Sequence, residues 1–82
     1  MGISDLPDAS GREIVRCLCE HFGLTFLRRG GRNHLILGQK GKNPPVLVSI
    51  PDHRKVKREL LATELTHAGI SHKAFAKAFK GK

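Results

Sequence analysis

The stretch Arg28–Leu37, which reads RRGGRNHLIL, holds the residues of this chain best suited to chemistry on a phosphate. Three arginines and two glycines run into His34, and an apolar run follows at once. Imidazole takes or gives a proton near neutral pH, and guanidinium groups bind phosphate oxygens. Two interpretations stand: His34 does acid–base chemistry on a phosphate that the arginines bind, or it is an ordinary strand-end residue on a basic surface.

A second group of cations follows the third apolar run of the chain. Its members crowd the start of a predicted helix: Arg54, Lys55, Lys57 and Arg58. A helix N-terminus already carries partial positive charge, so cations there are unfavourable until a negative partner relieves them. The alternative is a set of solvated side chains. His53 directly precedes this group, and it flanks one anionic groove with His34 if the second and third strands are neighbours.

The charge balance of the whole chain points to the same class of partner. Fifteen Lys and Arg against seven Asp and Glu give a formal net charge of +8 and a pI near 10.2 in 82 residues. Such an excess predicts attraction to nucleic acid, to an anionic membrane surface or to an acidic protein. A basic protein that is merely well solvated is the alternative.

The residue types narrow the chemistry further. The acidic residues are dispersed, so the sequence offers no carboxylate pair for two-metal catalysis. The glycines of RRGGR do not have the spacing of a phosphate-binding loop that ends in Gly-Lys-Ser/Thr. Four Phe without Tyr or Trp disfavour a reader that stacks on bases. Cleavage of RNA requires no metal, because the ribose 2′-OH is an internal nucleophile.

Metal, cofactor and membrane sites are not expected from the sequence. Cys17 and Cys19 lie two apart in a predicted helix, where their side chains do not meet, so a disulfide is not expected and a cytoplasmic location fits. Cys17 and His21 share a helix face, but nothing nearby completes a zinc site. No apolar run approaches the roughly 18 residues of a membrane span, and the N-terminus lacks a signal-peptide core.

Caps and periodicity predict the elements that position these residues. Residues 1–9 form a lead-in, and Ser10 with Glu13 forms a capping box that begins a helix over Gly11–Phe22. Strands are predicted over 24–27, running towards Arg29, over 34–39 and over 46–50, with Pro51 ending the last run. Gly30-Gly31 forms the first turn, and residues 38–45 form a loop.

The remaining chain predicts a second long helix and a short final one. Leu60, Leu61, Leu65 and Ala68 share a helix face that ends at Gly69, and Glu64 interrupts this apolar stripe. Ser71 caps a helix that carries Phe75 and Phe79. The order α-β-β-β-α-α predicts one α+β domain over residues 1–82, with a folded core over 10–80. Its two layers are a three-stranded antiparallel sheet and both long helices on one face of it.

Three stretches, in this order, resemble the HicA (YcfA) toxin family: LPDASGREIVRCL, GGRNHLIL and VSIPDHRKVKRELLATELTHAGIS. They are similar to the family's Leu-Pro lead-in and Ser-Gly-Lys/Arg-Glu helix, its Gly-Ser-His segment, its Val-Pro-x-His step and its closing Ala-Gly-Ile-Ser. The resemblance covers nearly the whole chain after residue 5. Members usually carry the histidine at the place of Asn33, and here it stands one position later, at His34. A shift of one residue along a strand turns a side chain to the opposite face unless the turn absorbs it.

The resemblance implies a double-stranded-RNA-binding-domain-like fold and the toxin of a type II toxin–antitoxin pair. It implies metal-independent mRNA cleavage with His34 as general acid or base, inhibition by a HicB-type antitoxin, and His53 as a second candidate histidine, with a structural role as its alternative. The expected RNA contacts are Arg28, Arg29, Arg32, Asn33, Arg54, Lys55, Lys57 and Arg58. A non-catalytic RNA-binding module, or a toxin relative without activity, is the alternative function, and a basic partner for an acidic protein is a third.

Overall fold

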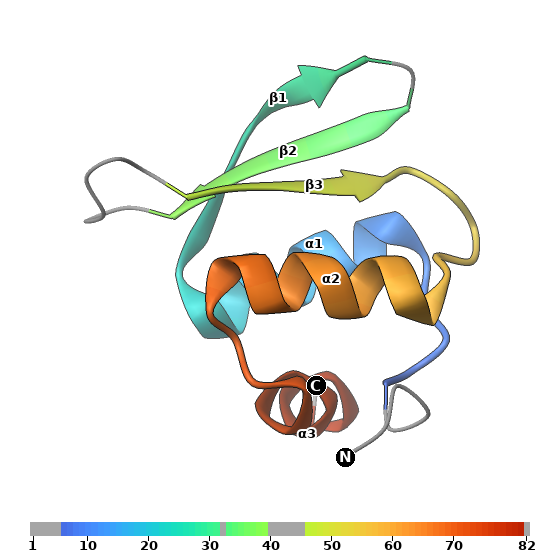
Figure 1. The fold of residues 1–82 in the computed structure, drawn as a ribbon, viewed down its shortest axis with the longest axis vertical. Coiled ribbons are helices and arrows are strands. Elements are labelled where there is room, and N and C mark those ends of the chain that lie inside the picture. Colours follow the sequence, from blue (N-terminus) through green and yellow to red (C-terminus); the bar gives the residue numbers. More distant parts are fainter. Residues whose placement is uncertain (1–5, 32, 40–45, 82) are drawn as a thin grey trace.

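A computed structural model of the protein describes residues 6–31, 33–39 and 46–81 (Figure 1). Its elements follow in the order α1 (Gly11–Phe22), β1 (Leu24–Gly30), β2 (His34–Gln39), β3 (Leu47–Pro51), α2 (Arg58–Ala68) and α3 (His72–Lys80). The predicted order α-β-β-β-α-α and the α+β class are confirmed.

Helix α1 begins where the sequence predicts, because its capping box forms. The Ser10 hydroxyl accepts from the Glu13 backbone N–H at 3.2 Å, and the Glu13 carboxylate accepts from the Ser10 N–H at 3.1 Å. Gly23 ends the helix in the left-handed conformation, with φ of 71°. Ser71 likewise caps α3 by accepting from the Ala74 N–H at 3.2 Å.

The three strands form one antiparallel sheet in the order β1-β2-β3. Strand β1 continues beyond 24–27 through Arg28 and Arg29, in the predicted direction, and ends at Gly30. Arg28 and Arg29 pair with Ile36 and Leu35. The register shifts between Phe26 and Arg28, where Leu27 is the extra residue. Strand β3 is shifted by one residue from the prediction and includes Pro51 as its last residue.

Helices α1 and α2 cover one face of the sheet (Figure 1). The core between the layers comes from alternate strand residues such as Leu37, Val48 and Ile50 and from helix residues such as Ile14 and Leu61, all nearly inaccessible to solvent. Among the described residues no helix covers the opposite face of the sheet, here called the helix-free face (Figure 1).

Helix α3 packs against α1 and α2 on the side away from the sheet (Figure 1). Phe75 is fully buried there, with its ring centroid 6.3 Å from that of Phe22 and 5.9 Å from that of Phe79. This aromatic contact joins the last helix to the end of the first one.

Glu64 interrupts the apolar stripe of α2 for a structural reason. Its carboxylate accepts from the backbone N–H of Ser49 at 3.0 Å, and Ser49 lies in the edge strand β3. The Ser49 N–H points away from β2. The backbone nitrogen of Pro51, two residues further on, faces the same way, but proline has no N–H that could be left unpaired. Both residues protect the edge of the sheet from pairing with another strand.

In the part of the chain that the structure describes, no helix combines the length and the apolar character needed to cross a membrane.

Candidate nucleic-acid interface

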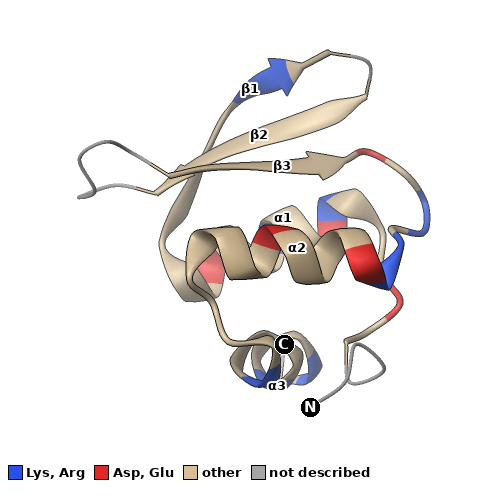
Figure 2. Ribbon diagram, viewed as in Figure 1, with Lys and Arg blue, Asp and Glu red and all other residues tan. Residues whose placement is uncertain are grey.

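One end of the sheet, here called the Gly30 end, gathers most of the predicted site residues. Gly30 at the end of β1 pairs with His34 at the start of β2, and His34 pairs with Pro51 at the end of β3. Helix α1 begins at the same place, because the Gly11 N–H donates to the His53 carbonyl at 2.9 Å. Lys and Arg residues mark this end on β1, on α1 and on the segment between β3 and α2 (Figure 2).

His34 lies at the first position of β2 and is half-buried. Leu35 and Leu37 point into the molecule, so alternation along the strand places His34 and Ile36 on the helix-free face. The imidazole Nδ1 lies 3.7 Å from the position that a Cβ at Gly31 would take. The ring therefore lies against the glycine turn and outside the aliphatic core.

Arg28 shares the helix-free face with His34. It pairs with Ile36, and its Nη1 lies 3.2 Å from the position of a Cβ at Gly30, the cross-strand partner of His34. A side chain at Gly30 would also come within 2.8 Å of Ile36 Cγ1. The missing side chain of Gly30 therefore leaves the space that the Arg28 guanidinium and Ile36 occupy, one residue before the glycine beside which the His34 imidazole lies.

A groove of about 390 Å³ continues from Arg28 along the side of α2. Its lining residues are Arg28, Ile36, Leu47, Val48, Ser49, Thr63, Glu64 and His67. The groove combines apolar side chains with a guanidinium, a carboxylate and an imidazole. His67 was not among the predicted site residues, and only the packing of α2 beside β3 places it here.

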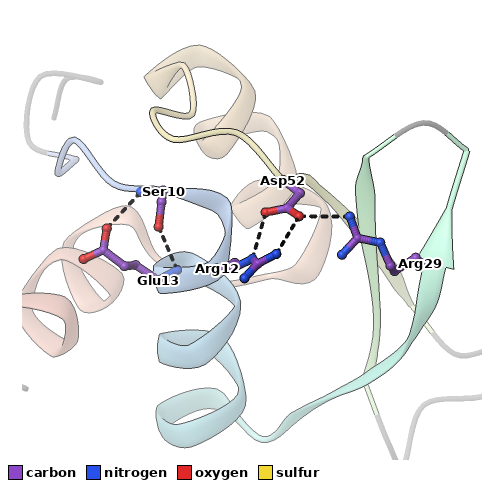
Figure 3. Close-up of polar contacts among 5 residues, drawn as sticks. All are labelled: Ser10, Arg12, Glu13, Arg29 and Asp52. Atoms are coloured by element: carbon purple, nitrogen blue, oxygen red, sulfur yellow. Dashed lines mark hydrogen bonds and ion pairs between the residues drawn. The ribbon is translucent and has the colours of Figure 1, made fainter.

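Arg29 projects to the other side of the sheet, towards the helices. It pairs with Leu35, and its Nη2 lies 2.9 Å from Oδ2 of Asp52 (Figure 3). Arg12 of α1 binds the same carboxylate, with its Nε 3.2 Å from Oδ1 and its Nη2 3.5 Å from Oδ2 (Figure 3). The structure therefore separates Arg28 from Arg29, which sequence reasoning placed on a single phosphate.

These three residues, Arg12, Asp52 and Arg29, form what is called the Asp52 cluster below. Hydrogen bonds from Arg29 and then from Arg12 lower the pKa of the Asp52 carboxyl below its ordinary value. Neither Arg12 nor Asp52 was among the predicted site residues. Nothing in their local sequence could have found them, because they lie 40 positions apart and meet only through the fold.

Two of the four cations in the second group bind the lead-in segment, and the other two do not. Arg58 donates from Nε to the Leu6 carbonyl at 3.0 Å and lies 3.2 Å from the Asp8 carboxylate, and Lys55 lies 3.8 Å from the same carboxylate. Arg54 and Lys57 are exposed and make no ion pair within the described residues. Helix α2 begins at Arg58, so Arg54 and Lys55 precede the helix, contrary to the prediction, and Lys57 is its N-cap without a side-chain bond.

Asn33 and His53, which were also predicted, lie at the Gly30 end. Asn33 is exposed in the turn before β2 with φ of 55°, and its carbonyl accepts from the Asp52 N–H at 2.6 Å. The strand begins only after it, at His34. His53 has an exposed side chain, and its backbone carbonyl binds the start of α1. Arg32 lies outside the described residues.

Among residues 6–31, 33–39 and 46–81, no group of three or more His, Cys, Asp or Glu side chains is placed to hold a metal ion. Comparison of the chain with protein-family models, with curated proteins and with solved structures finds no match.

Proposed function

We propose that the protein is a metal-independent endoribonuclease, the toxin of a type II toxin–antitoxin pair, which cleaves mRNA in the cytoplasm. One observation carries this proposal: at one end of the sheet the His34 imidazole lies beside Gly31, and the Arg28 guanidinium lies beside Gly30, the residue that pairs with His34. The similarity of three sequence stretches to the HicA family supports it, and so does the net charge of +8.

The chemistry requires one group to move a proton and one to bind the phosphate. His34 takes the proton from the ribose 2′-OH, and the freed oxygen attacks the adjacent phosphorus. The bond from phosphorus to the 5′-oxygen breaks, this oxygen takes up a proton, and a 2′,3′-cyclic phosphate remains. Alternatively, His34 supplies the proton to the leaving oxygen. Arg28 stabilises the negative charge that gathers on the phosphate oxygens.

A HicB-type antitoxin is the proposed protein partner. An acidic inhibitor that covers the Gly30 end would block access to His34 and Arg28 together, and opposite charge would attract it to this end. A complex that leaves Gly31 and His34 fully exposed would contradict inhibition by steric cover.

Replacement of His34 by Ala is the direct test. We expect cleavage of labelled RNA by the purified protein to fall by about 100-fold or more, because a general acid or base contributes about that factor. Affinity for RNA and the unfolding temperature should remain close to those of the wild type, since the ring lies outside the core.

His21→Ala is the matched control for this test, because His21 is an exposed histidine in the last turn of α1. Its cleavage rate should equal that of the wild type, and a chelator should leave the activity of the wild type unchanged. Undiminished cleavage by the His34→Ala variant would exclude the assignment.

A non-catalytic RNA-binding module is the second candidate function. It is favoured by the exposed cations Arg29 and Arg54, whose attraction to phosphate needs no proton transfer. Both functions predict RNA binding that weakens with salt, because each phosphate contact releases counterions. The wild-type protein incubated with RNA separates them, since only the ribonuclease yields shorter products.

A further inference from the structure

The Asp52 cluster lies on a backbone that is fixed on both sides. The Asp52 N–H donates to the Asn33 carbonyl at 2.6 Å, and the next carbonyl, that of His53, accepts from the Gly11 N–H at 2.9 Å. A Cβ at Gly11 would lie 2.0 Å from the Pro51 carbonyl oxygen, so only glycine allows α1 to approach this closely. The Asp52 carboxylate is therefore held in one place relative to α1, β1 and β3.

The cluster has an excess of positive charge, and this charge faces the solvent. Two guanidinium groups share one carboxylate, which leaves one positive charge over. The Asp52 side chain is 13% exposed, against 78% for Arg12 and 53% for Arg29. Each guanidinium has five N–H donors, and Asp52 occupies one or two of them on each arginine. The free donors of both arginines remain available to an anion.

The cluster and His34 lie on opposite sides of the same sheet end. Arg29 points towards the helices, whereas Arg28 and His34 point to the helix-free face. The Asn33 carbonyl that binds Asp52 belongs to the residue directly before His34. The two groups therefore lie at one end of the sheet, where an RNA strand that passes around this end contacts them with different phosphates.

We propose that Arg12 and Arg29 form a binding site for an RNA backbone phosphate other than the cleaved one, and that Asp52 is the residue that positions both guanidinium groups. This inference rests on the proposed function for the identity of the ligand. Arginine suits the role because its planar donors match the oxygens of a phosphate. Because Arg12 and Arg29 are already hydrogen-bonded to Asp52, their side chains lose less conformational entropy when a phosphate binds.

Arg12→Ala compared with Arg16→Ala tests the phosphate contact. Arg16 lies one turn further along α1, is 72% exposed and pairs with Glu20 at 3.3 Å, so both changes remove one exposed, ion-paired cation. The ligand is a fluorescent RNA whose 2′-OH groups are all O-methylated, which prevents cleavage. We expect Arg12→Ala to lose about tenfold in affinity relative to Arg16→Ala and to lower the salt slope by about one. Equal affinities for the two variants would overturn the proposal.

Asp52→Asn separates positioning from charge. The change raises the formal net charge from +8 to +9, so an effect of charge alone would tighten RNA binding. We expect weaker binding by several-fold, because the neutral amide no longer holds two guanidinium groups. Tighter or unchanged binding would contradict the positioning role.

Two further arms cover an unstable variant and a different ligand. If Asp52→Asn fails to fold by circular dichroism, Arg12→Lys and Arg29→Lys replace it, since each keeps the charge and loses the planar donors; wild-type affinity in both would overturn the site. Polyglutamate serves as the acidic protein probe. If Arg12→Ala loses affinity for polyglutamate and keeps its affinity for RNA, the cluster binds a protein partner, and the RNA site is overturned.

The result of these binding experiments does not depend on catalysis, because the O-methylated RNA cannot be cleaved. A wild-type protein that leaves ordinary RNA intact, while Arg12→Ala still weakens binding, would refute the ribonuclease and support this phosphate site.

Discussion

At the scale of single residues, Gly30 decides how closely Arg28 approaches the end of the sheet that carries His34. The space that its missing side chain leaves is bounded by Ile36 Cγ1 at 2.8 Å and by Arg28 Nη1 at 3.2 Å. Gly30 is the last residue of β1, and a close approach of other groups is a common reason for a glycine in a strand. Here the groups that approach are the side chain of Ile36 and the guanidinium that we assign to the cleaved phosphate.

Gly30→Ala should therefore impair cleavage more than stability. The new methyl group displaces Arg28 and Ile36, and we expect the single-turnover cleavage rate to fall about tenfold or more, because small misplacements of catalytic groups have large effects. The free energy of unfolding should fall by about 1 kcal/mol from the crowding. Urea unfolding and a cleavage assay on the same preparation measure both. A normal rate in this variant would show that Arg28 does not act beside His34.

The sequence places His34 correctly and misplaces its neighbours, for a physical reason. His34 begins β2 as predicted, since the turn residues before it and the apolar run after it define the strand. Arg28 and Arg29 are expected to bind one phosphate, but alternation along β1 places them on opposite faces of the sheet. Arg12 meets Asp52 only through long-range packing, which no local pattern encodes.

At the scale of elements, local signals predict the helices best. The capping box at Ser10, the cap at Ser71 and the glycine stops act within one turn of chain, and all of them form. Glu64 contradicts the pattern of α2 because its partner, the Ser49 N–H, belongs to another element. Strand ends are less predictable, because pairing with a neighbour and not composition decides where a strand stops.

Lys57 and Arg58, adjacent at the start of α2, should differ in their roles. Arg58 binds the Leu6 carbonyl and the Asp8 carboxylate, so Arg58→Ala should lower the free energy of unfolding by about 1 kcal/mol. Lys57 is exposed, so Lys57→Ala should change stability by less than about 0.5 kcal/mol and should weaken RNA binding instead. Chemical unfolding and an RNA titration check the pair, and equal stability losses would contradict this division.

At the scale of the whole molecule, Asp52 connects α1 and β1 to the segment that follows β3, so its ionisation affects global stability. The pKa of Asp52 is lowered in the folded protein from its ordinary value of 3.8. A carboxyl with a depressed folded-state pKa stabilises the fold above its unfolded-state pKa, and this contribution is lost as the pH falls through the folded-state pKa.

Wild type should therefore be more stable than Asp52→Asn at pH 7, and the difference should shrink as the pH falls below about 4. Thermal unfolding of both proteins from pH 7 to pH 2 measures it. The other carboxyls titrate in both proteins, so the difference between the two curves isolates Asp52. A difference that stays constant over this range would mean that the charge of Asp52 does not stabilise the fold.

The contact between Gly11 and Pro51 also bears on the order of folding. The hairpin of β1 and β2 closes over a few residues, whereas α1 reaches the end of β3 across about 40 positions, and closing such a long loop is slow. We expect the first helix to form early and to dock last. A nascent chain from which residue 52 has not yet emerged would lack the carboxylate that binds Arg12 and Arg29, so these two arginines would not yet be held together.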